Sequence, residues 1–417
     1  MNRLACLLVL WVTLGMVCSA SAEDHSLEAN TTKEDLRQLK EEVEKIKQEY
    51  EQKIKELRQK IEDLSERQSQ AAVPQQPSGA SAVSSSVSGI QSFNPEISMI
   101  GDFVGKTTSD ENDDNGDRFS VREVETAFSA SVDPYARADF FLSLEEDQGE
   151  RDFNLEEGYL TFLSLPLGLQ AKLGKFKDHF GKANLYHTHN SPWVDDPTMI
   201  ANFFGEEGLN GQGISLNRLI SNPWDQYVEL TLEAVNNDNP ESFSGNNGDS
   251  LAFIAHLKNF LEFSDASNLE VGLSAATGPN DQGHGGYRTN LEGMDLTYRW
   301  RPPEQGLYKS LIFQNELLFS QKDQPLGGEV RSLGGYSYLG YQFQRRWSAG
   351  TRYDYSEFPD NNDHLEKVLS GILTFQQSEF AFLRLQYTHR ERNFSDNANE
   401  LWLQCNFGIG PHRAHQY

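Results

Sequence analysis

Stretches of about ten residues in which apolar and polar side chains alternate recur from Glu96 to the C-terminus. In residues 135–145, for example, Arg137, Asp139 and Ser143 lie between apolar side chains. A period of two indicates a β-strand with one apolar and one polar face. About sixteen such strands are predicted, at residues 96–106, 118–131, 135–145, 153–164, 168–177, 212–220, 226–236, 250–260, 268–277, 289–300, 309–321, 332–343, 346–356, 366–376, 379–390 and 399–410.

The connections between these strands alternate in length. One set is short, at residues 132–134, 165–167, 222–224, 265–267, 344–345 and 377–378. The interleaved set is longer, polar and mostly acidic, as at residues 107–117, 236–249, 277–288 and 356–364. Short turns at one rim and long loops at the other are typical of transmembrane β-barrels. A soluble sandwich has no reason to sort its loops in this way, so an all-β antiparallel transmembrane barrel of about sixteen strands is predicted for residues 93–417.

Closure of the barrel follows from the bilayer, because an unpaired backbone group in hydrocarbon costs several kcal/mol. An even number of strands returns both ends of the barrel to the same side of the membrane. At two places, Arg122-Glu123 and Glu156-Glu157, the alternation slips by one residue. Each slip predicts a β-bulge.

The N-terminal segment predicts export. Asn2 and Arg3 precede an uncharged apolar run from Leu4 to Val17, and Ala20-Ser21-Ala22 provides the small residues of a cleavage site. Residues 1–22 are therefore expected to be a signal peptide, since about 20 apolar residues are needed to span a bilayer. No long apolar run recurs and the mean hydropathy is −0.61, which excludes a helical membrane protein. The mature chain keeps Cys405 alone, so it forms no intramolecular disulfide.

Residues 23–70 are predicted to form a periplasmic coiled coil. Apolar residues recur at heptad spacing with one stutter, at Leu36, Leu39, Val43, Ile46, Tyr50, Ile54, Leu57, Ile61 and Leu64. So narrow a stripe cannot bury itself on one helix, which favours a clasp that joins barrels into a homotrimer; the alternative is a solitary charged helix. Residues 71–92 are rich in Ser, Ala, Gly and Pro and are predicted to be a flexible linker.

The charge of the chain constrains its partners. The formal net charge is −26. Such a surface repels nucleic acid and concentrates cations. A barrel of this size is too wide for side chains alone to fill, so a water-filled passage is expected; the alternative is a barrel closed by internal ion pairs. The side chains expected to face the lumen are Arg137, Asp139, Lys172, Asp295, Arg299, Arg352, Asp354 and Arg384.

The longest connection, residues 178–207, is richer in aromatic residues than the other loops. A loop free in water would not need them, so it is expected to fold into the barrel and narrow the pore. Its titratable residues would line or flank the constriction: Asp178, His179, His187, His189, Asp195, Asp196, Glu206 and Glu207. An acidic constriction favours cations. The predicted function is passive diffusion of small hydrophilic solutes, with a preference for cations.

Motifs for other chemistry are weak. His187-Thr188-His189 could bind a transition metal, but a single His-x-His pair is more often a pair of solvated loop histidines. No metal site or cofactor is therefore predicted. The chain contains no nucleophile elbow, zinc-protease motif, P-loop or dinucleotide fingerprint, and an enzyme is not expected.

Several segments carry a family resemblance: FNPEISMIGDFVG, REVETAFSASVDPYARADFFLSLEE, LEEGYLTF, LGKFKDHFGKANLYHTH and FFGEEGLNGQGIS. They resemble a family of bacterial outer-membrane barrel proteins, loosely related to the phosphate-selective porins and often labelled porins or zinc-regulated outer-membrane receptors. The resemblance covers residues 93–417 and is strongest over 93–219. It implies a barrel in the outer membrane, in contact with its lipid bilayer.

Two departures narrow what the resemblance implies. Residues 91–417 carry 48 acidic and 25 basic side chains, whereas phosphate selectivity needs a basic lumen. The space before the barrel holds the predicted coiled coil and linker rather than a plug domain, so energised uptake is not expected. The alternatives to a diffusion channel are an envelope tether with a closed barrel and a metal-related receptor.

Overall fold

The computed structural model describes residues 95–113, 116–147, 150–236, 239, 241–243, 251–280, 286–324 and 327–410. The predicted signal peptide, coiled coil and linker lie outside the described residues, as does the tail from residue 411. No helix in the described part of the chain is long and apolar enough to cross a bilayer.

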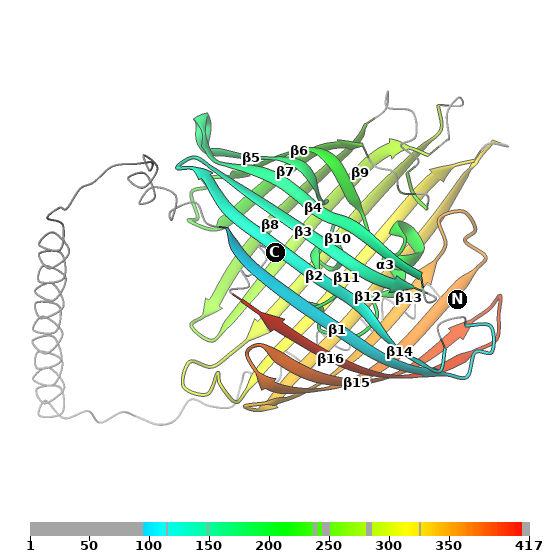
Figure 1. Ribbon diagram of the computed structural model, residues 1–417. Helices are drawn as coiled ribbons and strands as arrows, with labels where there is room; N and C mark the ends of the chain where they lie inside the picture. The colour runs from blue at the N-terminus through cyan, green and yellow to red at the C-terminus, as the bar shows by residue number, and fades with distance from the viewer. Residues whose placement is uncertain are drawn as a thin grey trace, which may run out of the picture. The chain divides into compact units, whose positions relative to one another are not determined.

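Sixteen antiparallel strands form one closed barrel, in which each strand pairs with its neighbours in the chain and β1 pairs with β16. Figure 1 shows the strands running obliquely around the barrel. The strands are β1 (Glu96–Thr108), β2 (Arg118–Asp133), β3 (Ala136–Asp147), β4 (Glu150–Leu165), β5 (Leu169–Lys177), β6 (Asn210–Leu219), β7 (Tyr227–Asn236), β8 (Ala252–Ser264), β9 (Ser267–Pro279), β10 (Arg288–Trp300), β11 (Ser310–Asp323), β12 (Glu329–Gln344), β13 (Trp347–Glu357), β14 (Leu365–Ser378), β15 (Ala381–Arg392) and β16 (Ala398–Ile409). The predicted closed barrel and its sixteen strands are confirmed.

The two faces of the wall differ as the alternation predicts. Along β16, Leu401, Leu403 and Phe407 are exposed on the outside, whereas Gln404 and Asn406 between them are buried on the inside. An outward apolar face with an inward polar face is the arrangement that a barrel needs in a lipid bilayer.

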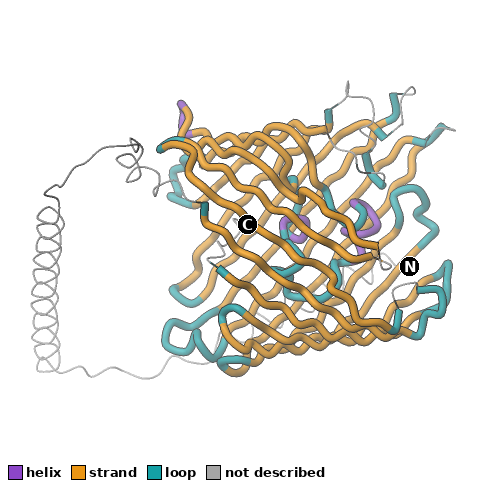
Figure 2. Tube along the Cα trace, in the orientation of Figure 1, coloured by secondary structure: helices purple, strands orange, loops and turns teal. Residues whose placement is uncertain are grey.

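Loops and turns lie at the two ends of the strand wall (Figure 2). The predicted alternation of short and long connections holds for most of the barrel and fails most clearly at two places. A long connection is expected between β3 and β4, but only residues 148–149 separate them, because both strands extend far toward the rim of the long loops. On the opposite rim, residues 301–309 join β10 to β11 and include Pro302 and Pro303, which cannot donate a ladder hydrogen bond.

Both predicted bulges are present. Between β1 and β2, Asp102 pairs with Glu123 and Phe103 pairs with Val121, which leaves Arg122 as the extra residue. Between β3 and β4, Phe141 pairs with Glu157 and Leu142 with Leu155, which leaves Glu156 as the extra residue. Each bulge therefore places two charged residues next to each other, on a strand whose apolar and polar side chains otherwise alternate.

The outward apolar face predicts the effect of a charge placed on it. Leu403 is 49 % exposed and lies in the middle of β16. Leu403→Arg is expected to destabilise the barrel in lipid vesicles by about 2–4 kcal/mol, because a guanidinium near the bilayer midplane loses its hydration. Urea unfolding in vesicles measures the change, and Asn362→Arg, in an exposed loop, is the control. Equal stability of both variants would contradict a lipid-facing position for Leu403.

Candidate functional site

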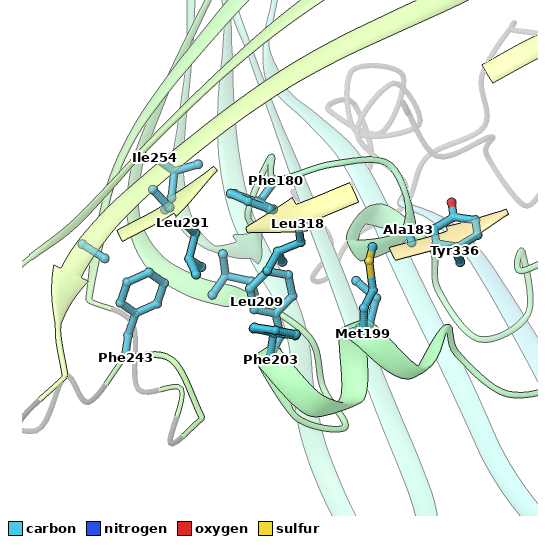
Figure 3. Packing of buried hydrophobic residues seen from close by; sticks show 14 of the residues in the cluster. Phe180, Ala183, Met199, Phe203, Leu209, Phe243, Ile254, Leu291, Leu318 and Tyr336 are labelled. Atoms are coloured by element: carbon cyan, nitrogen blue, oxygen red, sulfur yellow. The ribbon is translucent and has the colours of Figure 1, made fainter. Parts of the chain in front are cut away.

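The connection between β5 and β6, residues 178–209, packs against the inner wall of the barrel. It contains a 3-10 helix, η3 (Ala183–Leu185), and a short α-helix, α3 (Thr198–Phe204). Figure 3 shows Phe203 of α3 beside Leu209, with Leu318 of β11 and Phe180 close by, and Met199 of α3 nearer to Ala183. Each buried phenylalanine contributes about 1.5–3 kcal/mol to holding this connection in place. We call residues 178–209 the inner loop.

Trp193 is the centre of the inner loop's aromatic contacts. Its side chain is fully buried, and its ring lies edge-on to Tyr336 at 5.3 Å and to Tyr338 at 5.4 Å between ring centroids. Tyr186, also of the inner loop, approaches it at 5.8 Å. The guanidinium of Arg352 lies over the indole, 5.1 Å from its centroid. Edge-to-face and cation–π contacts of this kind fix the orientation of the ring as well as its burial.

Arginines of β13 and β15 hold the segment that follows Trp193. Arg352 Nη1 donates to the carbonyl of Asp195 at 2.6 Å, and its Nη2 donates to the Asp195 carboxylate at 3.1 Å. Arg384 Nη1 donates to the carbonyl of Trp193 at 2.8 Å. Arg390 Nη2 lies 3.5 Å from the Asp195 carboxylate. Burial raises the pKa of Asp195, but the charges of Arg352 and Arg390 lower it by more. The pKa of Asp195 is therefore below its ordinary value.

Arg122 fastens the same segment from the opposite strands. Its Nη1 donates to the carbonyl of Val194 at 2.5 Å, and its Nε donates to Asp102 of β1 at 2.7 Å. The inner loop therefore bridges β2 on one side and β13 and β15 on the other. Arg122 is the extra residue of the β2 bulge, and the bulge is what allows both it and Glu123 to reach inward.

The start of the inner loop is held by carboxylates of β7, β9 and β11. Glu316 accepts hydrogen bonds from the backbone amides of Lys182 at 3.1 Å and Ala183 at 3.0 Å. The Lys182 ammonium lies 2.5 Å from Glu270. Gly181 has a φ of +65°, and a Cβ there would lie 1.6 Å from a Glu316 oxygen, so only glycine fits this turn.

His187 lies in a cluster of four glutamates from β2 and β4. Its Nδ1 lies 3.0 Å from Glu125 and 3.0 Å from Glu156, and its Nε2 lies 2.7 Å from Glu157. Burial lowers the pKa of His187, but the hydrogen bonds to these three carboxylates raise it well above its ordinary value.

His189 adjoins the same cluster. Its Nδ1 lies 3.5 Å from Glu125 Oε2, and its ring centroid lies 5.7 Å from that of His187. Glu123 completes the set, because it offers an oxygen within 4.8 Å of the ligand atoms of Glu125 and His189. We call His187, His189, Glu123, Glu125, Glu156 and Glu157 the His–Glu cluster.

A cavity of about 280 Å³ lies between the inner loop and strands β1 to β3. Its charged lining consists of Lys106, Arg118, Arg122, Glu123, Glu145, Glu146, Asp195, Asp196 and Glu206. Acidic side chains outnumber basic ones there, and Asp196 and Glu206 are exposed. The cavity reaches the His–Glu cluster through Glu123, which belongs to both.

The structure does not gather the eight predicted inner-loop residues at one place. Asp195, Asp196 and Glu206 line the cavity, whereas His187 and His189 join the His–Glu cluster. His179 pairs with Glu233 of β7 at 2.7 Å. Asp178 is buried and its amide donates to Leu209, and Glu207 is mostly exposed, 3.9 Å from Lys175. The loop's turns separate residues that are close in sequence.

The residues predicted to face the lumen do not form one group; they contact different partners at separate places on the inner wall. Arg137 donates to Asp139 at 2.7 Å, and Arg352 donates to Asp354 at 2.9 Å. Arg299 lies 3.5 Å from Glu270, and the ammonium of Lys172 lies over the ring of Tyr159. Asp295 is buried near the loop's start, and Arg384 binds the Trp193 carbonyl.

The sequence analysis predicted the two bulges but not that their charged residues belong to the site. It identified the slips at Arg122-Glu123 and Glu156-Glu157 but named neither pair as site residues. Glu125 was missed because it keeps the ordinary alternation of β2. The signal that could have found the cluster was the pair of slips itself, since bulges are common next to functional sites.

The contacts of Arg352 predict a large effect of its removal. Arg352→Met leaves Asp195 and Asp354 without this cation, and breaking a buried ion pair in this way costs about 3–5 kcal/mol. The midpoint of urea unfolding in vesicles is expected to fall accordingly. Arg331→Met is the control, because the Arg331–Glu329 pair is exposed and should change stability by less than about 0.5 kcal/mol. Similar midpoints for the two variants would contradict the anchoring role.

Comparisons with known proteins bear on the fold. No family model matches the chain. An uncharacterised protein of Aquifex aeolicus (strain VF5) is 27 % identical over 392 residues, spanning 78 % of this chain and 81 % of that protein.

Three solved structures share the barrel. Pseudomonas putida OprB matches with a TM-score of 0.55 at 11 % identity, over 78 % of this chain and 96 % of its own. An anion-selective porin from Comamonas acidovorans matches with a TM-score of 0.53 at 10 % identity, over 76 % and 100 %. The outer-membrane channel DcaP of Acinetobacter baumannii matches with a TM-score of 0.50 at 10 % identity, over 76 % and 97 %. The fold of this chain is therefore that of the sixteen-stranded outer-membrane porins.

Proposed function

We propose that this chain is a porin-like channel of a bacterial outer membrane, through which small hydrophilic solutes diffuse passively. The observation that carries the proposal is a closed barrel with an apolar outer face, a charged inner face and a charged cavity beside the inner loop. The shared fold with outer-membrane porins supports it. The cavity beside β1 to β3 is the proposed narrow part of the pore.

The proposed channel prefers cations. Asp196 and Glu206 are exposed on the cavity wall, and Glu145 and Glu146 line it from β3. Asp195 is paired with Arg352 and Arg390, so the exposed carboxylates carry the proposed preference. Several like charges in a narrow passage raise the local concentration of ions of opposite sign. The basic side chains on the same wall, Arg122 among them, are partly neutralised by Asp102 and other carboxylates.

A second candidate is an envelope tether with a closed barrel, and the packing of the inner loop favours it. The loop contacts β2 through Arg122 and reaches β13 and β15 through Arg352 and Arg384, so it spans the lumen. The two candidates differ in a single measurable property, which is ionic conductance.

Conductance across planar bilayers tests the proposal. The purified chain in a KCl gradient is expected to show ohmic conductance. Its reversal potential is expected to have the sign that indicates a higher permeability to K⁺ than to Cl⁻. Asp196→Lys combined with Glu206→Lys is expected to shift that potential toward anions, because both side chains lie on the cavity wall. Glu304→Lys and Glu379→Lys, in exposed turns away from the cavity, are the matched controls and should leave it unchanged.

Absence of conductance would contradict the proposed channel and favour the envelope tether. Conductance with an unshifted reversal potential in the double variant would instead show that ions do not pass this cavity.

We further propose that residues 23–70 join the barrels into a homotrimer. The proposal rests on the heptad spacing of the apolar residues from Leu36 to Leu64, since a stripe of this width is buried by helix association. Deletion of residues 33–70 is expected to convert trimers into monomers, measured as the mass of the protein in detergent by light scattering. Deletion of the linker residues 75–85 is the control and should leave the trimer intact. A trimer that survives the first deletion would refute the clasp.

A further inference from the structure

The His–Glu cluster brings metal-binding atoms together without their being neighbours in the sequence. Glu123, Glu125 and His189 each offer one ligand atom, and these atoms lie within 4.8 Å of one another. Glu125, Glu156 and His187 form a second set with the same property, so Glu125 is shared. Ligand atoms bound at about 2.0–2.2 Å to one ion must lie within roughly twice that distance of each other. Both sets are therefore close to the spacing that a single ion requires.

The cluster is buried and strongly acidic. The side chains of His187 and Glu125 are each 1 % exposed, and that of His189 is 5 % exposed. Four carboxyl groups surround two imidazoles, so the acidic groups of the cluster outnumber its basic groups. Burying uncompensated charge is costly unless a cation pairs with it.

An unsatisfied oxygen points to a missing partner. Glu125 Oε1 is buried and accepts no hydrogen bond within the described part of the chain, while Oε2 of the same carboxylate faces both histidines. A buried carboxylate oxygen without a partner destabilises the folded chain, because it has lost its hydration and gained no hydrogen bond. A cation bound by Glu125 would remove this cost.

Glu157 sets the orientation of the His187 ring. It lies 2.7 Å from Nε2, so Nε2 donates to Glu157 and Nδ1 faces Glu125 and Glu156. Histidines that bind metals usually donate their other ring N–H to a carboxylate or carbonyl, which fixes the ring and makes it a better ligand. Glu157 is therefore placed as the positioning residue of a metal-bound histidine.

An ion can reach the cluster from solvent. Glu123 belongs to the cluster and also lines the cavity of about 280 Å³, together with Thr188, which separates the two histidines in sequence. The cavity therefore leads to the edge of the cluster at Glu123.

We propose that the His–Glu cluster binds one divalent first-row transition-metal ion at Glu125, the residue that the two sets share. Glu123 and His189 offer ligands on one side of Glu125 and Glu156 and His187 on the other, so an ion that takes both histidines draws the two sets closer together. Mixed imidazole and carboxylate donors suit such ions, whereas Mg²⁺ and Ca²⁺ prefer oxygen ligands alone. The bound ion joins the inner loop to β2 and β4, across the lumen from the Arg352 contacts. The site does not depend on whether the barrel conducts.

Metal titration of the full chain in detergent tests the site. After treatment with EDTA and dialysis, the protein is titrated with CoCl₂, followed by visible absorption, and with ZnCl₂, followed by calorimetry. One equivalent is expected to bind per chain, and a large excess of MgCl₂ should not displace it. Glu125→Gln and His189→Asn each preserve approximate side-chain size and are expected to weaken binding by at least about 10–100-fold.

Two matched controls separate this site from other histidines. His179→Asn alters a histidine of the same inner loop that pairs with Glu233 outside the cluster, and it should leave binding unchanged. His412→Asn combined with His415→Asn removes the histidines of the C-terminal tail and should also leave it unchanged.

Binding that survives Glu125→Gln and His189→Asn, or that is lost with the tail histidines, would overturn the proposal, as would the absence of saturable binding. Heat-modifiable migration on gels verifies that each variant retains its barrel. A variant that lost the barrel would be replaced by Glu156→Gln, which changes a partly exposed ligand and is expected to show the same weakening.

Discussion

The pairing of β1 with β16 is the constraint on which the rest of the structure depends. Their antiparallel register runs from Met99 opposite Ile409 to Thr108 opposite Glu400 and closes the ring. In hydrocarbon an open edge would leave a row of unpaired amides and carbonyls, each costing several kcal/mol. Closure permits the outward face to be largely apolar. It also obliges the polar half of every strand to face a lumen, where those groups need partners of their own.

The inner loop supplies many of those partners. Arg352 and Arg384 are buried, and they donate to backbone carbonyls of residues 193 and 195 as well as to side chains. Glu316 accepts from two loop amides in the same way. Wall and loop thus satisfy each other's buried polar groups, and the loop's aromatic residues add the apolar contacts. Neither the charged wall nor the irregular loop backbone would be stable in this form alone.

The sequence predicted the wall far better than the site, and the reason is physical. Period two fixes which face each strand residue occupies, and a one-residue slip is visible as a break in that pattern, as at Arg122 and Glu156. No such rule fixes the path of a loop of some thirty residues. That His187 meets Glu125 and Glu157, whereas His179 meets Glu233, depends on how Phe180, Trp193 and Phe203 pack in three dimensions.

The two bulges and the His–Glu cluster have a common explanation. β2 and β4 flank β3, and each carries its extra residue at the level where the inner loop brings His187 to the wall. A bulge disrupts ladder hydrogen bonds, so an extra residue in a membrane strand is tolerated where the side chains it redirects contribute more than the ladder loses. One carboxylate would be enough to pair a protonated histidine. β2 and β4 bring four carboxyl groups to the two histidines, more than the pairing of one protonated histidine needs, and the proposed metal ion accounts for this excess.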